Sequence, residues 1–350
     1  MQRKLVSDGS LPAEVVDAAI ISPGMIDLQV NGAIGHEVRD RPADVDAIST
    51  WLPNTGVSAW LPTIVTADEA LYSRVFQAWS EIDVAVGAMP LGLHLEGPFL
   101  SAARKGAHQL RYIEAATDAL FDSWLEQESI ALVTLAPERE GGHRRIRHLV
   151  ERGVVVSLGH TDATSEQFRE GVDLGATKAT HLFNAMSPVH HRDPGAMVAA
   201  MLDDRLSAGI IPDGVHAHPD MIRLAIRTKG VDRMIVVSDM MTATGLGPGT
   251  YALSGQSVRV DNISARLEDG TLAGSILTMD EAIRNLVEWG EVTPAQALHM
   301  ATTVPARVLR DTTRGEIVPG RRADLTLWND DLTVSETLIG GRRFPTREGA

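Results

Sequence analysis

The sequence has no cysteine, no excess of positive charge and no long apolar run. Without cysteine the chain cannot form disulfides or thiolate metal sites, so a bound metal would be held by histidine and carboxylate side chains. The formal net charge of −14 argues against nucleic acid or an anionic membrane as a partner, because both bind basic surfaces. A small anionic substrate is compatible with this charge, since a single pocket can be locally positive.

The apolar runs are too short for a membrane protein. None approaches the roughly 18 residues of a membrane span, and residues 1–21 lack the apolar core of a signal peptide. We therefore expect a soluble, cytoplasmic protein with no membrane partner. A length of 350 residues with 44% hydrophobic content is enough for one large α/β domain or two ordinary ones.

Strand-like apolar runs alternate with amphipathic helical segments, such as 68–82, 143–153 and 165–175. This alternation predicts parallel strands joined by right-handed crossovers. There are eight strand-like runs, at 25–30, 58–65, 91–96, 130–137, 154–160, 177–183, 207–214 and 233–239. Eight units favour a (β/α)8 barrel over an open doubly wound sheet. The open sheet usually has G-x-G-x-x-G after its first strand, and PGMIDLQVNGAIG does not fit that pattern.

The pattern changes after the eighth strand. Residues 250–274 are rich in turns and alternate in polarity, which predicts a small β excursion. Helical segments follow at 278–290 and 293–309, the second with Thr293 as N-cap and Pro294 in the first turn. The end of the chain returns to strand-and-turn alternation and is expected to pair with the N-terminal residues. The predicted domains are a small β domain from 1–22 and 316–350 and a barrel from 23–315.

Glu96 stands out because it lies in LGLHLEGPFL, an aliphatic run that would reject an unpaired carboxylate. Polar residues also fall at the ends of other predicted strands. The C-terminal ends of the strands carry the active site of a (β/α)8 barrel, so we expect these side chains to share one mouth. They are Gln29, Asn31, Glu96, His160, His181, His216 and Asp239.

Three of these residues form a candidate metal site. Glu96, His160 and His181 provide one carboxylate and two imidazoles, the ligand set of a catalytic divalent ion with open positions. Taken singly, the glutamate is equally compatible with a pair to arginine or lysine, and each histidine with a bond to a backbone carbonyl. Together, at the ends of three strands, they favour a metal. Asp239 is the candidate acid/base for amide hydrolysis, although aspartate after a strand is also a common helix N-cap.

A series of motifs extends this interpretation. In chain order they are PGMIDLQVNG, LGLHLEGPFLSAARKGAH, VSLGHTDAT, ATHLFNAMSPVHHRDPG, IIPDGVHAHPD, VSDMMTATG and LAGSILTMDEAIRNLVE. Over about residues 20–328 the chain resembles the N-acetylglucosamine-6-phosphate deacetylases of the amidohydrolase superfamily. The resemblance implies a (β/α)8 barrel with a small β domain, and usually a homodimer.

The resemblance also implies roles for individual residues. Glu96, His160 and His181 would be the metal ligands, Asp239 the acid/base, and His216 a hydrogen-bond partner of the substrate near the amide carbonyl. Asn184, Ala185 and Arg192 would hold the phosphate, for which a guanidinium offers a planar fork, although without the motif Arg192 would be interpreted as an exposed loop residue. His190 and His191 are assigned to the loop surface. The remaining substrate contacts would be Ala107, His108, Leu272, Ala273 and Gly274.

Two local features bear on metal count and substrate. Many amidohydrolases have His-x-His at the end of strand one, which supplies a second metal. Here Gln29-Val30-Asn31 stands at that position, a poorer ligand set for zinc, so we expect one divalent ion per chain, with zinc favoured. Met240 and Met241 replace the smaller residues that are usual after the catalytic aspartate, and a bulkier wall beside the sugar would change substrate preference.

The expected activity is the deacetylation of N-acetylglucosamine 6-phosphate by metal-activated water, with Asp239 as acid/base. Three alternatives stay open. The first is the N-acetylgalactosamine 6-phosphate isomer, and the second is another amidohydrolase activity on an N-acylated small molecule. The third is an inactive barrel used for binding, against which stands the presence of all three candidate ligands and of Asp239.

Overall fold

The computed structural model describes residues 18–82, 86–290 and 292–346. Its centre is one parallel sheet in the order β2-β5-β7-β8-β9-β10-β11-β12. The sheet curves into a nearly closed barrel, since β12 and β2 approach each other where Asp239 N donates to Gln29 O over 3.0 Å. The strands are β2 (Met25–Val30), β5 (Val57–Val65), β7 (Leu93–Glu96), β8 (Ile130–Leu135), β9 (Val155–Leu158), β10 (Lys178–Ala179), β11 (Ser207–Ile210) and β12 (Met234–Val236). The predicted (β/α)8 barrel is confirmed.

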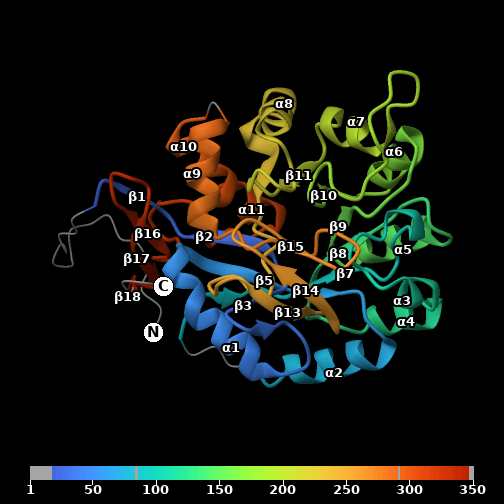
Figure 1. Ribbon diagram of the computed structural model, residues 1–350, viewed down its shortest axis with the longest axis horizontal. Coiled ribbons are helices and arrows are strands. Elements are labelled where there is room, and N and C mark those ends of the chain that lie inside the picture. The colour runs from blue at the N-terminus through green and yellow to red at the C-terminus, as the bar shows by residue number, and fades with distance from the viewer. Residues whose placement is uncertain (1–17, 83–85, 291, 347–350) are drawn as a thin grey trace.

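Helices cover the outside of the barrel (Figure 1). The predicted helical segments correspond to α2 (Glu69–Trp79), α5 (Gly142–Glu151), α6 (Ser165–Asp173) and α9 (Met279–Trp289). The predicted helix over 293–309 begins with a Thr293 capping box but is two helices, α10 (Pro294–Ala301) and α11 (Thr303–Val308). It is interrupted at Thr302, whose backbone is not helical, with φ −128° and ψ −73°. Within the described ranges no helix is long and apolar enough to cross a membrane.

Both ends of the chain contribute to a separate antiparallel sheet. β1 (Ile20–Pro23) pairs with β16 (Leu325–Trp328), and β17 (Val334–Ile339) and β18 (Arg342–Pro345) follow in order. In Figure 1 the blue β1 therefore lies beside the red C-terminal strands. This confirms a small sheet built from both ends, although residues 1–17 of the predicted domain lie outside the described residues.

The β excursion is a three-stranded antiparallel sheet of β13 (Gly249–Leu253), β14 (Gln256–Val260) and β15 (Ala265–Arg266). It has its own apolar core, which includes Met241, Leu253 and Val258. Leu253 and the segment after β15 also line the cavity at the barrel mouth. The excursion is therefore placed to form one wall of that cavity.

Candidate active site

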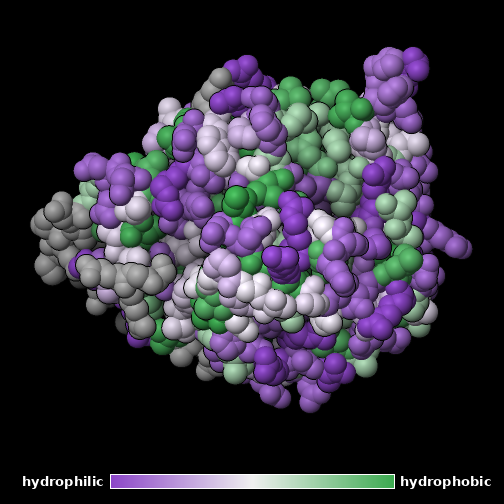
Figure 2. Space-filling model, viewed as in Figure 1, coloured by the Kyte–Doolittle hydropathy of each residue, from purple (hydrophilic) through white to green (hydrophobic). Residues whose placement is uncertain are grey.

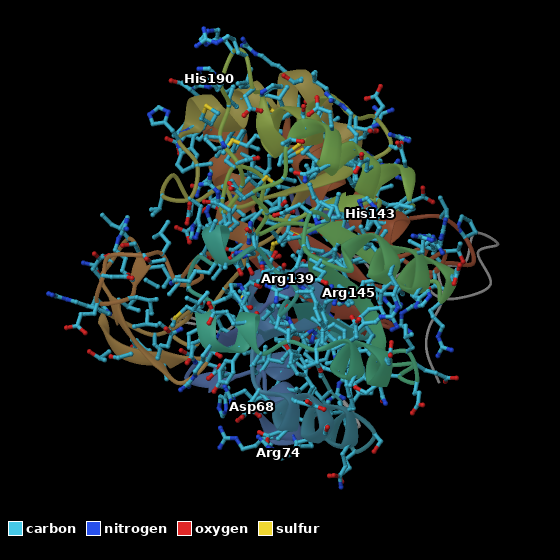
Figure 3. The ribbon with its side chains drawn as sticks, turned by 90° about the vertical axis from the view of Figure 1, so that its right-hand side faces the viewer. Asp68, Arg74, Arg139, His143, Arg145 and His190 are labelled. Carbon is cyan, nitrogen blue, oxygen red and sulfur yellow. The ribbon has the colours of Figure 1, made fainter. Side chains whose placement is uncertain are left out.

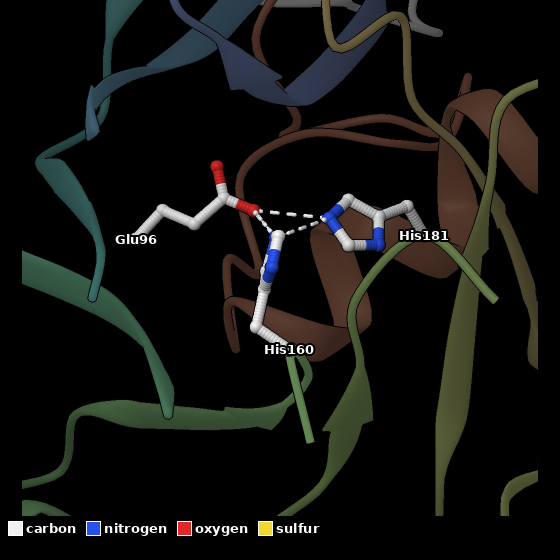
Figure 4. A group of neighbouring side chains, drawn as sticks. All are labelled: Glu96, His160 and His181. Carbon is white, nitrogen blue, oxygen red and sulfur yellow. Dashed lines mark hydrogen bonds and ion pairs between the residues drawn. The ribbon is translucent and has the colours of Figure 1, made fainter. Parts of the chain in front are cut away.

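Glu96, His160 and His181 meet at the C-terminal ends of three barrel strands (Figure 4). Glu96 ends β7, and the two histidines follow β9 and β10. Glu96 Oε1 lies 3.1 Å from His181 Nε2 and 3.4 Å from His160 Nε2, and the two Nε2 atoms are 3.1 Å apart. The side chains come from distant parts of the chain, yet their ligand atoms point at one common position.

The geometry of this group fits a metal ion. Zinc ligands at about 2.0–2.1 Å in a tetrahedral site lie roughly 3.3 Å from one another, close to the separations found here. His160 Nδ1 donates to the carbonyl of Arg104 over 2.9 Å, which leaves Nε2 with the lone pair that a metal requires. Burial alone would raise the pKa of Glu96, but the neighbouring His160 and His181 side chains hold it well below its usual value. The carboxylate is therefore ionised and available as a ligand.

Several site residues have a left-handed backbone. The φ angle is +47° at His160, +25° at His181, +51° at Ala185 and +52° at Asp239. L-residues rarely adopt these values, and the cost is tolerated mainly where surrounding structure fixes the chain for function. At His160, His181 and Asp239 this turn follows a barrel strand and directs the side chain into the cavity at the barrel mouth.

Asp239 lies beside the three candidate metal ligands, and the side-chain amides of two residues hold it in place. Its Oδ1 accepts from Asn31 Nδ2 over 2.7 Å and from Gln29 Nε2 over 3.0 Å. Gln29 Nε2 also lies 3.1 Å from Glu96 Oε1. Burial, together with the charge of Glu96, raises the pKa of Asp239 to about 6. A carboxylate with a pKa near the working pH can both accept and return a proton.

His216 is oriented by Asp213. Its Nδ1 lies 2.6 Å from Asp213 Oδ2, and its backbone N–H donates to Asp213 Oδ1 over 2.8 Å. Burial would raise the pKa of Asp213, but its hydrogen bond with His216 lowers it, so the carboxylate is ionised. This pair occupies Nδ1 and leaves Nε2 for a substrate in the cavity.

His108 reaches the same cavity from the segment after β7. Thr66 Oγ1 donates to the Glu96 carbonyl over 3.1 Å, so it accepts from His108 Nδ1 at 2.7 Å. Burial, followed by the neighbouring His160, holds the pKa of His108 well below its usual value. His108 is therefore neutral, with Nε2 as an acceptor for a hydroxyl group.

These side chains line one cavity of about 340 Å³ at the barrel mouth. The predicted site residues that line it are Glu96, Ala107, His108, His160, His181, Asn184, Ala185, His216, Asp239, Leu272 and Gly274. Ala273 is buried in the core of the β excursion instead. Met240 and Met241 are also buried away from the cavity lining, so the expected bulky wall beside the substrate is not formed by their side chains.

Arg192 is not among the residues that line the cavity of its own chain. It lies in the exposed loop 188–193, where its Nη1 contacts His191 Nε2 at 2.8 Å. Figure 3 shows His190 of this loop at the outer edge of the molecule. Sequence reasoning did not single out Arg104, the guanidinium that does line the cavity and pairs with Asp162 at 2.7 Å. Its position directly before the segment Lys105-Gly106-Ala107-His108 gave no separate signal. Asp213 of the DGVH motif could have been found from its i,i+3 spacing to His216.

Comparisons with known proteins agree with this site. Residues 20–344 match the model of the amidohydrolase family. An N-acetylglucosamine-6-phosphate deacetylase of Bacillus subtilis is 37% identical over 332 residues, covering 92% of this chain and 84% of that protein. An N-acetylgalactosamine-6-phosphate deacetylase of Escherichia coli O157:H7 is 38% identical, covering 93% of this chain and 88% of that protein. The structure of a mutant N-acetylglucosamine-6-phosphate deacetylase of Mycobacterium smegmatis, in complex with N-acetylglucosamine 6-phosphate, superposes with a TM-score of 0.89 at 33% identity, covering 98% of this chain and 92% of that one.

The chain therefore belongs to the amidohydrolase family, and it is a hydrolase acting on an amide bond. Within that family it belongs with the N-acetylglucosamine-6-phosphate deacetylases, as the motifs indicated. The galactosamine relative is as similar as the glucosamine relative, so overall identity does not distinguish the two sugars.

Proposed function

We propose that this protein removes acetate from N-acetylglucosamine 6-phosphate, giving glucosamine 6-phosphate. The observation that carries the proposal is the convergence of Glu96, His160 and His181 beside Asp239 in one cavity. A metal-ligand group next to a carboxylate with a pKa of about 6 provides what amide hydrolysis requires. The named activities of the relatives supply the substrate class.

One divalent ion per chain, zinc in preference, would be held by Glu96, His160 and His181. When bound there it supplies Lewis acidity to a carbonyl and lowers the pKa of a water molecule. Gln29 and Asn31 direct amide nitrogens toward Asp239, an arrangement that disfavours a second cation beside them. Metal analysis that found two ions per chain at full activity would refute the single site.

Asp239 has the central role in proton transfer. As the attacking water forms the new C–O bond, Asp239 accepts its proton and then donates it to the nitrogen as the C–N bond breaks. His216, fixed by Asp213, directs Nε2 at the substrate near the amide carbonyl. His108 Nε2 accepts from a hydroxyl of the sugar. The second proton of the water stays on the acyl product, so the products are acetic acid, which ionises to acetate in solution, and the free amine, and Asp239 ends each cycle as a carboxylate.

We assign the phosphate end of the substrate to Asn184, Ala185 and Arg192. The first two line the cavity, whereas Arg192 lies on an exposed loop outside it. Either the loop closes over the site or a second copy of the chain supplies its Arg192. The remaining substrate contacts, at Ala107 and Leu272 to Gly274, stay predictions.

A homodimer is part of the proposal, and the surface offers a place for it. Leu202 of α7 (Gly195–Leu202) is 60% exposed, and Leu224 of α8 (Pro219–Lys229) is 45% exposed. Figure 2 shows hydrophobic surface over these two helices. Val189, in the same loop as Arg192, is 53% exposed. An apolar face next to the Arg192 loop would be covered in a dimer. We retain a cytoplasmic location and a role in amino-sugar metabolism as predictions.

The second candidate substrate is N-acetylgalactosamine 6-phosphate, favoured by the 38% identical relative of that name. The test is a deacetylation assay on both sugar phosphates and their unphosphorylated forms, with metal analysis of the same sample. We expect kcat/KM to be highest for the glucosamine phosphate, with one ion per chain. A higher value for the galactosamine phosphate would reverse the assignment, and no release of acetate from any of the four would refute the activity.

A further inference from the structure

Two buried amides connect the end of β2 to the catalytic carboxylate. Gln29 and Asn31 are almost fully buried, at 0% and 2% exposure. Both direct their side-chain nitrogens to one oxygen, Asp239 Oδ1, over 3.0 and 2.7 Å. Gln29 Nε2 in addition lies 3.1 Å from Glu96 Oε1. One NH2 group therefore lies between two carboxylates that would otherwise repel each other.

The orientation of the two amides follows from these contacts. Gln29 Oε1 and Asn31 Oδ1 have no protein hydrogen-bond partner within the described part of the chain. A flipped amide would place its oxygen against Asp239 or Glu96, which disfavours the opposite assignment. Both amide nitrogens thus face carboxylates, and as a consequence both amide oxygens are buried without a protein partner. Such an arrangement in a well-packed barrel points to a role other than stability.

Backbone hydrogen bonds also fix the chain around Asp239. Asp239 N donates to Gln29 O over 3.0 Å, and Asn31 N donates to Met240 O over 2.9 Å. On the other side Ser275 N donates to Asp239 O over 2.8 Å. These bonds maintain the left-handed φ of +52° at Asp239. Both the main chain and Oδ1 of this residue are therefore fixed from the end of β2.

We propose that Gln29 and Asn31 are positioning residues for Asp239. By holding Oδ1, they leave Oδ2 as the oxygen that accepts the proton of water and returns it to the amine. The donor on Gln29 also keeps Asp239 and Glu96 close without a cation between them. This inference rests on the proposed deacetylase function and deepens it.

The test compares Asn31→Ala and Asn31→Asp with the unmodified enzyme. Asn31→Asp keeps the shape of the side chain but replaces the donor with an acceptor. We expect kcat to fall by about 100-fold in both variants, the scale of a catalytic group displaced by about 1 Å. KM and the number of ions per chain should stay as they are. The matched control is Asn54→Asp, which removes an amide donor bonded to the Trp51 carbonyl at 2.8 Å, away from the cavity, and should keep kcat.

A double mutant separates positioning from a general structural effect. If Asn31 acts through Asp239, adding Asn31→Ala to Asp239→Asn should change the residual kcat by less than about twofold. An equal loss in both backgrounds, unchanged kcat in Asn31→Ala, or loss of the ion together with activity would overturn the inference. An unmodified enzyme that releases no acetate would instead refute the proposed function, so the two failures are distinguishable.

Discussion

The mouth of the barrel and its interior contain the same kinds of side chain in different arrangements. At the mouth, Glu96 and two histidines point their ligand atoms at one position beside a cavity. In the interior, His94 lies between two hydroxyls, with Nδ1 3.1 Å from Thr63 Oγ1 and Nε2 2.8 Å from Thr134 Oγ1. Burial lowers the pKa of His94 to about 3, so this ring is neutral.

The other interior charges are also enclosed. Asp27 accepts from Ser238 Oγ over 2.5 Å, and burial raises its pKa to about 6. Lys178 is fully buried without a hydrogen-bond partner for Nζ among the described residues, and burial lowers its pKa to about 8. None of these three side chains lines the cavity. His94 and Glu96 are two residues apart on one strand and face the same side. The depth of a side chain in the barrel, and not its residue type, therefore decides whether it has a structural or a catalytic role.

The largest expected loss of activity comes from replacing a metal ligand, and replacing an interior histidine provides the comparison. His181→Ala should abolish the metal site, with a loss of activity of at least about 10⁴-fold, because both Lewis acidity and the activated water depend on the ion. His94→Gln is the matched control, since an amide can still bond both threonine hydroxyls. It should keep its ion and change kcat by less than about threefold, at a stability cost of about 1 kcal/mol. Metal analysis and steady-state kinetics check both variants; loss of the ion in His94→Gln would contradict the distinction.

The next largest effect on kcat is expected at Asp239, with the interior Asp27 as the comparison. Asp239→Asn should fold and bind metal but lose about 10³-fold in kcat, because an amide cannot accept the proton of water. Asp27→Asn retains an acceptor for Ser238 and should remain active within about threefold. Near-normal turnover in Asp239→Asn would exclude it as the acid/base.

A smaller effect is expected at the proposed phosphate site. Arg192→Ala should raise KM for the phosphorylated sugar by about 10- to 100-fold, since charge-assisted bonds to phosphate are strong, while leaving the unphosphorylated sugar little changed. Arg147→Ala, an exposed arginine on α5, serves as the control. Equal effects on both substrates would remove Arg192 from phosphate recognition.

The smallest effect on activity is expected in the interior, where stability should change instead. Lys178 has a pKa of about 8 in the fold against an ordinary value of 10.5, which corresponds to a penalty of about 3 kcal/mol at pH 7. The penalty is complete below pH 8, where both states are protonated, and disappears as the pH rises toward 10.5. Lys178→Met should therefore raise the free energy of unfolding at pH 7, with a gain that shrinks above pH 8. Denaturant unfolding across pH 7–10 measures it, and a destabilised variant at pH 7 would contradict the account.

The sequence predicted the barrel well because apolar runs and helical spacing are local patterns. The run at 25–30 coincides with β2 (Met25–Val30). The predicted strands were too long where ligands follow them: β9 ends at Leu158 and β10 at Ala179, before His160 and His181. The left-handed backbone at both histidines ends the strand, and hydrophobic periodicity carries no signal for it.

The contacts that complete the site were harder to predict. The hydrogen bond from Gln29 to Asp239 joins residues 210 positions apart, and that from Asn31 spans 208. No local pattern marks such a pair, so the sequence placed the two amides at the barrel mouth and related them to metal count, but did not predict their bonds to Asp239. Arg192 lies in an exposed loop outside the cavity, as its local sequence indicated without the motif, whereas the motif predicted a contact with the phosphate.

The central claim is that one ion is held by three ligands at the barrel mouth. Anomalous X-ray diffraction at the zinc edge, on crystals grown with zinc, tests it most directly. We predict one strong peak per chain, about 2.0–2.2 Å from Glu96 Oε1, His160 Nε2 and His181 Nε2. No peak between these atoms, or a second peak of equal strength beside Gln29 and Asn31, would contradict it.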